Sequence, residues 1–312
     1  MKTRAVFFTD VKKLEIREID LPDPGPNQVQ AKSIVNGICM FEVWKYTSGD
    51  FNRNDIPGHE GVGIVTKVGK DVTWVKEGDY VSTNQWSEYS NIDVTTGIKL
   101  SCNPSNEGIH LVEPLSCAIN AYSHTDIYPG NKVIVFGAGY MGLLLIQLLG
   151  HAPLHSLVVV DAKAENLELA KAYGATEVIN ITVPGANERL EELKDQFDIA
   201  YEASGAKSAL DWCTKLSKYG GSIGLYAWHH EPRLMDTSTW HYKGTKILNV
   251  SPPITTNERL FRSFEASDLL MSCGKVSQEN LITHRYKFDD IEKAMQESVA
   301  RGDGFIKSLI EF

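Results

Sequence analysis

The sequence predicts an α/β protein in which a doubly wound parallel sheet is joined to a second, β-rich part. A glycine-rich segment lies between two apolar runs, at residues 133–136 and 157–160, which suit buried parallel strands. From residue 131 to about residue 250 the expected strands and helices alternate, as they do when helices cover both faces of a parallel sheet. Before residue 104 the chain instead carries short alternating segments and glycine-rich turns, which favour β structure.

Three glycines follow the first apolar run in G-x-G-x-x-G spacing. Gly137 permits the tight turn, Gly139 lets the backbone approach a pyrophosphate, and Gly142 lets helix and strand pack closely. The helix that starts here offers free N–H groups and the positive end of its dipole to that pyrophosphate. We therefore expect a dinucleotide to bind at Gly137, Ala138, Gly139, Tyr140, Met141 and Gly142.

An acid ends the second apolar run and completes the motif. Asp161 lies 19 residues past Gly142 and can accept hydrogen bonds from a ribose 2′-hydroxyl. A carboxylate at this place repels a 2′-phosphate, so NAD is favoured over NADP, although Lys163 lies close in sequence. The alternative interpretation, a glycine-rich turn in some other α/β protein, is disfavoured because strand, helix and acid all fit the motif.

The rest of the chain supplies the other elements of two domains. Near the N-terminus, strands are expected at residues 14–19 and 28–35, and a helix begins near residue 113. Later strands are expected at residues 177–181, 198–202, 222–227, 246–250 and 306–312, and helices at residues 164–173, 186–195, 208–216, 258–271 and 288–300. These elements predict a dinucleotide-binding domain at residues 116–250 and a second domain formed by residues 1–115 and 251–312.

Length, charge and cysteine content limit the class of protein. The 312 residues exceed one average domain, and a net charge of −9 without any basic run argues against a nucleic-acid partner. No apolar stretch approaches the length of a membrane span, and charged residues from Asp10 to Lys13 argue against an N-terminal signal peptide. The five cysteines, at positions 39, 102, 117, 213 and 273, are scattered and odd in number, which favours a reducing, cytoplasmic location.

A second set of residues has the chemistry of a metal site. Cys39, His59, Glu60 and Glu113 offer one thiolate, one imidazole and one or two carboxylates, which suit a tetrahedral zinc ion with one position open to water or substrate. The spacing alone leaves other interpretations open. Cys39 could be a small buried apolar residue, His59 and Glu60 a pair on a surface loop, and Glu113 an acid at a helix N-terminus.

Several motifs occur in the order found in one enzyme family. They lie at residues 37–39, 57–63, 68–69, 78–81, 113–115, 137–142 and 203–205. With them, nearly the whole chain resembles the medium-chain dehydrogenase/reductase superfamily, in its zinc-dependent alcohol and polyol dehydrogenase branch. The resemblance implies a GroES-like β domain around a catalytic zinc ion and a Rossmann domain for the cofactor. Glu-Pro-Leu at 113–115 is similar to sorbitol, threonine and glucose dehydrogenases, which favours Glu113 over Cys117 as the fourth zinc candidate.

The chain departs from the family pattern in two places. It passes from Val81 to Trp86 without the family's four-cysteine lobe, so one zinc ion is expected rather than two. The family's hydroxyl residue, which relays the proton from the alcohol, is Phe41 here, and the following acid is Glu42. We expect Glu60, or less directly Glu42, to take the proton through bound water. Otherwise the substrate's own hydroxyls do so, or activity on simple alcohols is absent.

These observations predict a zinc-assisted, NAD-dependent dehydrogenase that oxidises a secondary alcohol of a polyol, sugar or cyclitol to a ketone. The expected catalytic residues are Glu60, Cys39 and His59, and the resemblance implies a homo-oligomer, a dimer or tetramer. Two alternatives stay open: a zinc-free reductase of the same superfamily, and a non-catalytic NAD-binding regulatory protein. The aromatic residues at positions 41, 44, 46, 51 and 86 fit either a substrate pocket or the core.

Overall fold

Two units divide the chain, the first formed by Met1–Pro114 together with Thr255–Phe312 and the second by Leu115–Ile254. The computed structural model describes residues 1–93, 95–101, 109–250 and 257–312, with the side chains of residues 257–261 left undescribed. One residue of the sequence prediction, Cys102, lies outside the described residues. Within the described part of the chain, no helix is both long enough and apolar enough to cross a bilayer.

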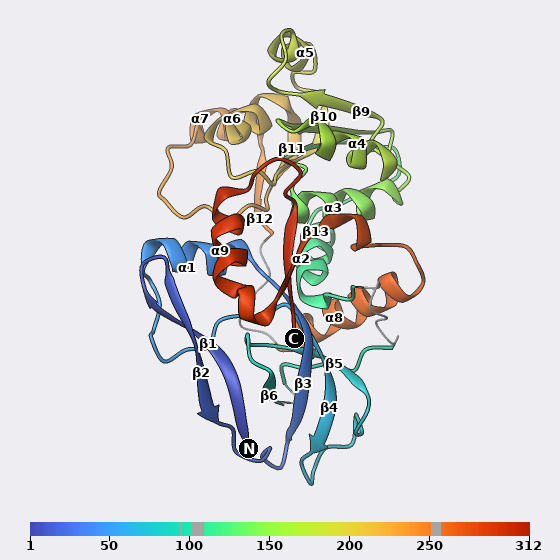
Figure 1. Ribbon diagram of the computed structural model, residues 1–312. Coiled ribbons are helices and arrows are strands. Elements are labelled where there is room, and N and C mark those ends of the chain that lie inside the picture. Colours follow the sequence, from blue (N-terminus) through green and yellow to red (C-terminus); the bar gives the residue numbers. More distant parts are fainter. Residues whose placement is uncertain (94, 102–108, 251–256) are drawn as a thin grey trace. The chain divides into compact units, whose positions relative to one another are not determined.

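A six-stranded parallel sheet forms the centre of the second unit (Figure 1). Its strands are β7 (Lys132–Phe136), β8 (Ser156–Asp161), β9 (Glu177–Asn180), β10 (Phe197–Glu202), β11 (Ser217–Leu225) and β12 (Lys246–Asn249). They are ordered β12-β11-β10-β7-β8-β9, so the chain starts inside the sheet, runs to one edge and then to the other. The predicted doubly wound parallel sheet is confirmed. Strands β7 and β8 coincide with the two apolar runs because strands covered on both faces need unbroken apolar residues.

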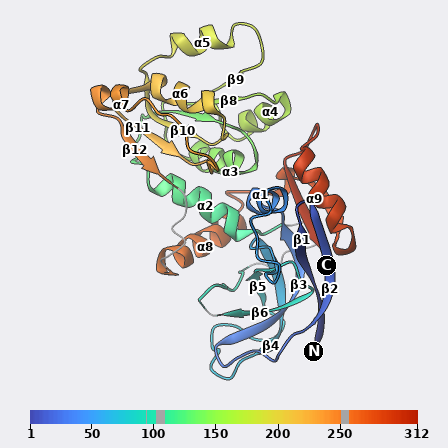
Figure 2. The ribbon, with the colours of Figure 1, turned by 90° about the vertical axis from the view of Figure 1, so that its left-hand side faces the viewer.

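Helices connect these strands and cover the sheet (Figure 2). They are α3 (Tyr140–Gly150), α4 (Ala164–Ala172), α5 (Ala186–Glu192), α6 (Lys207–Leu216) and α7 (Thr237–Lys243). Helix α6 packs Leu210, Cys213 and Leu216 into one core cluster with Ile134 and Ile223 of the sheet. Eight of the 11 residues of α3 are buried, so this helix is enclosed rather than amphipathic.

Antiparallel strands form most of the first unit. Strands β1 (Lys2–Asp10) and β2 (Lys13–Asp20) make a hairpin. A second sheet contains β3 (Gln28–Gly37), β4 (Gly61–Val68), β5 (Tyr80–Thr83), β6 (Tyr89–Asp93), β13 (Ile282–Lys287) and β14 (Lys307–Glu311). Its order is β13-β14-β3-β4-β5, with β6 also paired to β3. Because β14 pairs with β3, the two ends of the chain fold into one sheet.

Helices of the first unit lie around this sheet. They are α1 (Met40–Ser48), the start of α2 (Val112–Ser123), α8 (Asn257–Ser272) and α9 (Ile291–Ala300), with 3-10 turns at Glu279–Leu281 and Phe288–Asp290. Helix α1 was not among the elements expected from the sequence. It has only nine residues, begins at the N-cap Cys39 and ends at Gly49, so packing of Val43 and Tyr46 has to stabilise it.

Two further boundaries differ from the sequence prediction. Strand β11 begins at Ser217, five residues before the expected start at residue 222, in a segment whose exposed and glycine residues hide the strand pattern. The helix expected from residue 288 starts at Ile291, after the 3-10 turn. Strand β13 was not predicted. Its buried or half-buried residues alternate with exposed ones, and this alternation depends on pairing with β14.

Candidate functional site

Each predicted metal ligand lies where an element of the first unit begins. Cys39 is the N-cap of α1, and its sulfur accepts a hydrogen bond from the Phe41 N–H at 3.5 Å. His59 and Glu60 directly precede β4, and Glu113 is the second residue of α2. All four residues therefore lie in or directly beside a helix or strand. Such regular elements position side chains more precisely than loops do, as a preorganised site requires.

The fold brings these four residues together around His59. Donor atoms of Cys39, Glu42 and His59 all lie within 4.8 Å of one another, and those of His59, Glu60 and Glu113 form a second group within the same limit. Because His59 belongs to both groups, ligands that are up to 74 residues apart in sequence share one site. This mixture of sulfur, nitrogen and oxygen donors fits a zinc ion.

Glu42 belongs to this site although the predicted ligand set omitted it. It is buried, and its Oε1 lies 2.7 Å from Nδ1 of His59. A carboxylate in this place fixes the imidazole tautomer and leaves Nε2 to face a metal. Among the described residues the second oxygen of Glu42 is buried without a hydrogen-bond partner, which a nearby cation would remedy. The sequence signal was the spacing, since Glu42 follows Cys39 by three residues.

Glu60, which the sequence suggested as ligand and base, is also half of a buried ion pair. Nζ of Lys307 on β14 lies 2.5 Å from Oε2 of Glu60, and the two side chains are 6% and 1% exposed. Gly37 on β3 leaves the space for this carboxylate, because a Cβ there would lie 2.1 Å from Oε2. The partners are 247 residues apart, so no local pattern in the sequence could have predicted Lys307.

The charges of the site shift the ionisation of its members. Burial, and then the Glu60 carboxylate, raise the pKa of the Cys39 thiol. Burial opposes the charge on His59, but Glu42 helps to raise the pKa of His59 well above its usual range. Burial also opposes the charge on Lys307, whose pKa is nevertheless raised, chiefly by Glu60. The carboxylates therefore favour positive charge here, which a divalent cation can supply while displacing protons from the thiol and the imidazole.

A pocket of about 390 Å³ lies beside His59 in the first unit. Its lining residues are Phe8, Phe41, Glu42, Lys45, Phe51, Asn52, Asn54, Asp55, Ile56, Pro57, Gly58, His59 and Gln85. The aromatic residues singled out in the sequence divide between the two interpretations left open. Phe41 and Phe51 line the pocket, whereas Tyr46 and Trp86 are core residues with 1% and 0% exposure.

Phe41 lies in the wall of this pocket, next to His59. Its ring stacks on Trp44 and meets the ring of His59 edge-on, each with a centroid separation of 6.2 Å. Nζ of Lys45 lies 4.6 Å from the centroid of Phe41, a cation–π contact. The wall therefore presents an aromatic face and a cation where the resembled family has a hydroxyl group.

The glycine turn of the second unit links β7 to α3. Gly137 has a φ of 106°, a conformation that favours glycine, and a Cβ at this residue would lie 2.7 Å from the nitrogen of Ser204. A Cβ at Gly142 would lie 2.0 Å from the Gly137 carbonyl oxygen. At Gly139, a Cβ would meet no described atom within 4 Å, and no side chain caps α3 there. The open space and the uncapped helix start fit a pyrophosphate.

Asp161 ends β8 and contacts this turn. Its Oδ2 accepts a hydrogen bond from the Ala138 N–H at 2.6 Å, and its Oδ1 accepts one from the Lys163 N–H at 2.8 Å. The acid is thus held against Ala138, two residues before α3 begins with Tyr140 and Met141. A carboxylate oxygen can accept more than one hydrogen bond, so Asp161 can still receive a ribose hydroxyl.

A buried glutamate at the carboxyl end of β10 was missed in the sequence. Glu202 is fully buried, and its Oε1 accepts hydrogen bonds from the N–H groups of Ser204 and Gly205 at 2.9 and 2.8 Å. Nε2 of His229 lies 3.0 Å from its Oε2, and Arg233 donates to the Gly205 carbonyl. An acid closing a predicted strand beside the glycine turn was the available signal.

Two protein-family models match the chain. The model described as zinc-binding dehydrogenase matches residues 141–258, and the model described as alcohol dehydrogenase GroES-like domain matches residues 25–134. The first match covers α3 and most of the parallel sheet, and the second covers β3 to β6. The first match lies almost entirely in the second unit, and the second match lies mostly in the first unit and extends into the start of the second.

Curated relatives extend the similarity over most of the chain. L-threonine 3-dehydrogenase of Pectobacterium atrosepticum is 25% identical over 311 residues, covering 88% of this chain and 84% of the relative. Sorbitol dehydrogenase 1 of Saccharomyces cerevisiae is 27% identical over 357 residues, covering 98% of this chain and 97% of the relative. Both similarities run through the first and the second unit.

Solved structures share the fold along the full length, and the family follows from these findings together. An alcohol dehydrogenase from Escherichia coli CFT073, solved with NADH, has a TM-score of 0.88 at 22% identity and covers 100% of this chain and 99% of its own. A protein from Sinorhizobium meliloti described as a zinc-binding dehydrogenase, solved with NADP, has a TM-score of 0.87 at 19% identity, with both chains covered completely. The chain belongs to the zinc-dependent medium-chain dehydrogenase/reductase superfamily.

Proposed function

We propose that this protein is an NAD-dependent dehydrogenase that oxidises a secondary alcohol of a polyol, sugar or cyclitol to a ketone at a single zinc site. The observation that carries the proposal is the convergence of Cys39, His59, Glu60 and Glu113 within the first unit. Their donor atoms come from three separate chain segments and gather beside a pocket. Dehydrogenase activity on an alcohol agrees with the curated relatives.

The proposed zinc site assigns a task to each residue. Cys39 and His59 would bind the ion, with Glu42 holding the imidazole through Nδ1. Glu113 and Glu60 would supply further carboxylates close to His59. When bound by these residues, zinc would supply a Lewis acid that lowers the pKa of the substrate alcohol and so favours its oxidation by the nicotinamide cofactor.

The pocket favours a substrate with several hydroxyl groups over a simple alcohol. Asn52, Asn54 and Gln85 bring amide groups to its wall, which can donate to and accept from hydroxyls. Phe41 and Phe51 bring flat apolar faces, against which the C–H side of a sugar or cyclitol ring can pack. This combination of amides and aromatic rings is typical of carbohydrate-binding pockets.

The second unit favours NAD as the cofactor. The carboxylate of Asp161 lies beside the glycine turn, where it suits a ribose 2′-hydroxyl and repels a 2′-phosphate. The preference for NAD rests on this residue. The solved structures do not decide it, since one that shares the fold holds NADH and another holds NADP.

The proton of the alcohol needs an acceptor, because Phe41 carries no hydroxyl group. We assign this role to Glu60, whose carboxylate is buried among the metal-ligand candidates. Nζ of Lys307 pairs with the same carboxylate, and a positioned carboxylate can act as a general base.

A substrate panel combined with metal analysis tests the proposal. Purified protein is incubated with NAD or NADP and a set of polyols, sugars, cyclitols and simple alcohols, and the reduced cofactor is followed by its absorbance. Zinc is measured on the same sample. We expect one zinc ion per chain, reduction of NAD in preference to NADP, and activity on at least one polyhydroxy substrate.

A matched pair of variants connects the activity to the site. Cys39→Ser should lose zinc and activity, whereas Cys273→Ser, the same change at an exposed cysteine, should keep both. Activity without zinc would favour the zinc-free reductase. Binding of zinc and NAD without turnover of any substrate would favour the regulatory protein.

A further inference from the structure

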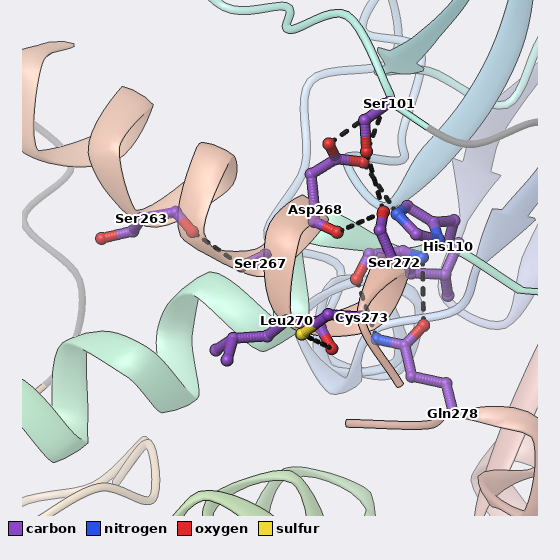
Figure 3. Close-up of polar contacts among 10 residues, drawn as sticks. Ser101, His110, Ser263, Ser267, Asp268, Leu270, Ser272, Cys273 and Gln278 are labelled. Atoms are coloured by element: carbon purple, nitrogen blue, oxygen red, sulfur yellow. Dashed lines mark hydrogen bonds and ion pairs between the residues drawn. The ribbon is translucent and has the colours of Figure 1, made fainter. Parts of the chain in front are cut away.

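The two residues that precede α2 are held by side chains from the far end of the chain. Figure 3 shows His110 beside Asp268 of α8, with Gln278 close to the same segment. All of these residues belong to the first unit. Residues 110 and 111 lead directly into α2, whose second residue is Glu113.

Gln278 makes the first of the two attachments. Its Oε1 accepts a hydrogen bond from the Leu111 N–H at 3.0 Å, and its Nε2 donates to the Leu111 carbonyl at 2.8 Å. The side-chain amide therefore pairs with both polar groups of one peptide residue, as a neighbouring strand would. Gln278 is 1% exposed and Leu111 0% exposed, so water cannot replace either bond.

Asp268 makes the second attachment. One of its oxygens lies 2.8 Å from Nε2 of His110, and the carboxylate also accepts from the Ser101 N–H at 3.1 and 3.0 Å. The side chains of His110 and Asp268 are 7% and 10% exposed. The segment before α2 is thus fixed on one side by α8 and on the other by Gln278.

This attachment determines where Glu113 lies. Each residue of an α-helix advances about 1.5 Å along the axis and turns about 100° around it, so a shift at the first turn is carried directly to Glu113. Metal ligands tolerate displacements of only about 0.2 Å from their preferred distances. A change in the peptide position of Leu111 therefore alters the geometry of a ligand two residues later.

We infer that Gln278 is a positioning residue for Glu113 and that, through the Leu111 peptide, it sets the affinity of the proposed zinc site. The inference rests on the proposed function, because it takes Glu113 as a member of that site. Gln278 touches neither metal nor substrate. Its effect comes from two hydrogen bonds that fix the start of α2.

Zinc affinity, measured on the full-length protein by competition with a chromophoric chelator, tests the inference. Gln278→Met keeps the length of the side chain and removes both hydrogen bonds. We expect it to raise the zinc dissociation constant by about 10- to 100-fold, the usual effect of losing an outer support of a metal ligand. Gln30→Met is the matched control, because Gln30 is also 1% exposed in the first unit but bonds to Pro22 and Asn91 instead.

A double-mutant cycle separates positioning from general loss of stability. Glu113→Ala should weaken zinc binding by itself, and Gln278→Met should add no more than about twofold in that background, because it then has no ligand to position. Gln278→Glu, whose protonated carboxyl can still accept and donate, should restore part of the affinity. If Gln278→Met does not fold, Gln278→Glu takes its place in the zinc-affinity measurement.

Three results would overturn the inference. Equal weakening of zinc binding by Gln278→Met in the wild-type and the Glu113→Ala backgrounds would show general destabilisation. Weakening by Gln30→Met as large as that by Gln278→Met would show the same. Unchanged zinc affinity in Gln278→Met, with Glu113→Ala weakened, would remove the positioning role and leave the proposed zinc site intact. Unchanged affinity in Glu113→Ala would remove Glu113 from the site, and the inference with it.

Discussion

Glu60 and Lys307 form a buried ion pair beside the candidate metal site. Both are almost completely buried, and each holds the opposite charge of the other. A buried charge without its partner is costly, because the interior cannot solvate it as water does. A variant at either position therefore tests stability and chemistry at once, and the two effects need separate measurements.

We predict that Glu60→Gln lowers the free energy of unfolding by about 3 to 5 kcal/mol, because the buried ammonium group of Lys307 loses the charged carboxylate of Glu60. The double variant Glu60→Gln with Lys307→Met should recover most of this loss. Urea unfolding of the metal-free proteins measures both changes. A double variant as unstable as the single one would contradict the prediction.

The same double variant isolates the proposed acid–base role of Glu60. If Glu60 takes the proton, turnover should fall by roughly 10²- to 10⁴-fold even where the fold is recovered, with NAD affinity unchanged. Zinc content has to be measured alongside, since loss of zinc would identify Glu60 as a ligand. Turnover close to that of the wild type would remove Glu60 from the mechanism.

Asp161 is the subject of a third prediction at the residue scale. Asp161→Ala should weaken NAD binding by about 10- to 100-fold, the equivalent of losing a charged hydrogen bond of about 1.5 to 3 kcal/mol. It should also reduce the preference for NAD over NADP, because the repulsion of the 2′-phosphate is lost. Calorimetric titration with both cofactors measures this. Tighter binding of NADP than of NAD to the wild type would refute the assignment.

Asp198 is important at the scale of elements, because it joins three adjacent strands at their amino ends. It lies on β10, accepts a hydrogen bond from the Lys132 N–H at the start of β7 at 2.7 Å, and pairs with Lys218 of β11. Burial works against its charge, but these two partners outweigh burial and lower the pKa of Asp198 below its usual value.

The lowered pKa gives a pH dependence with a definite sign. A carboxylate that is easier to ionise in the folded state stabilises the protein above its unfolded pKa of about 3.9, and this contribution is lost as the pH falls through the lower folded value. We predict that Asp198→Asn is less stable than the wild type by about 1 to 2 kcal/mol near pH 7. The difference should shrink below about pH 4 in urea unfolding. A constant difference at all pH values would contradict it.

At the scale of the whole molecule, one metal site is expected per chain. Strands β5 and β6 are separated by only the five residues 84–88, where the resembled family often inserts a four-cysteine lobe. We therefore predict one zinc atom per chain by elemental analysis, removable by a strong chelator with loss of activity. Two zinc atoms per chain would show that a second site exists.

Local sequence patterns predicted the parallel sheet of the second unit and the candidate residues of the site. The glycine turn, Asp161 and the alternation of strands and helices are local patterns, set by residues within about 30 positions of one another. Buried parallel strands can also be recognised in the sequence as unbroken apolar runs. Residue type and motif were also enough to select the metal-ligand candidates Cys39, His59, Glu60 and Glu113. They did not predict how these side chains are arranged in space.

Only the tertiary structure decided which distant groups surround those residues. Lys307 opposite Glu60, the imidazole of His59 held by Glu42, and Gln278 against Leu111 are contacts between segments that the sheet and α8 bring together. The nine-residue α1 and the burial of Trp86 likewise depend on packing rather than on local preference. A sequence motif specifies which side-chain atoms are available. Their burial and their charged partners depend on residues that are distant in sequence and are brought close only by folding. Burial and charge pairing then determine the pKa values of the site residues.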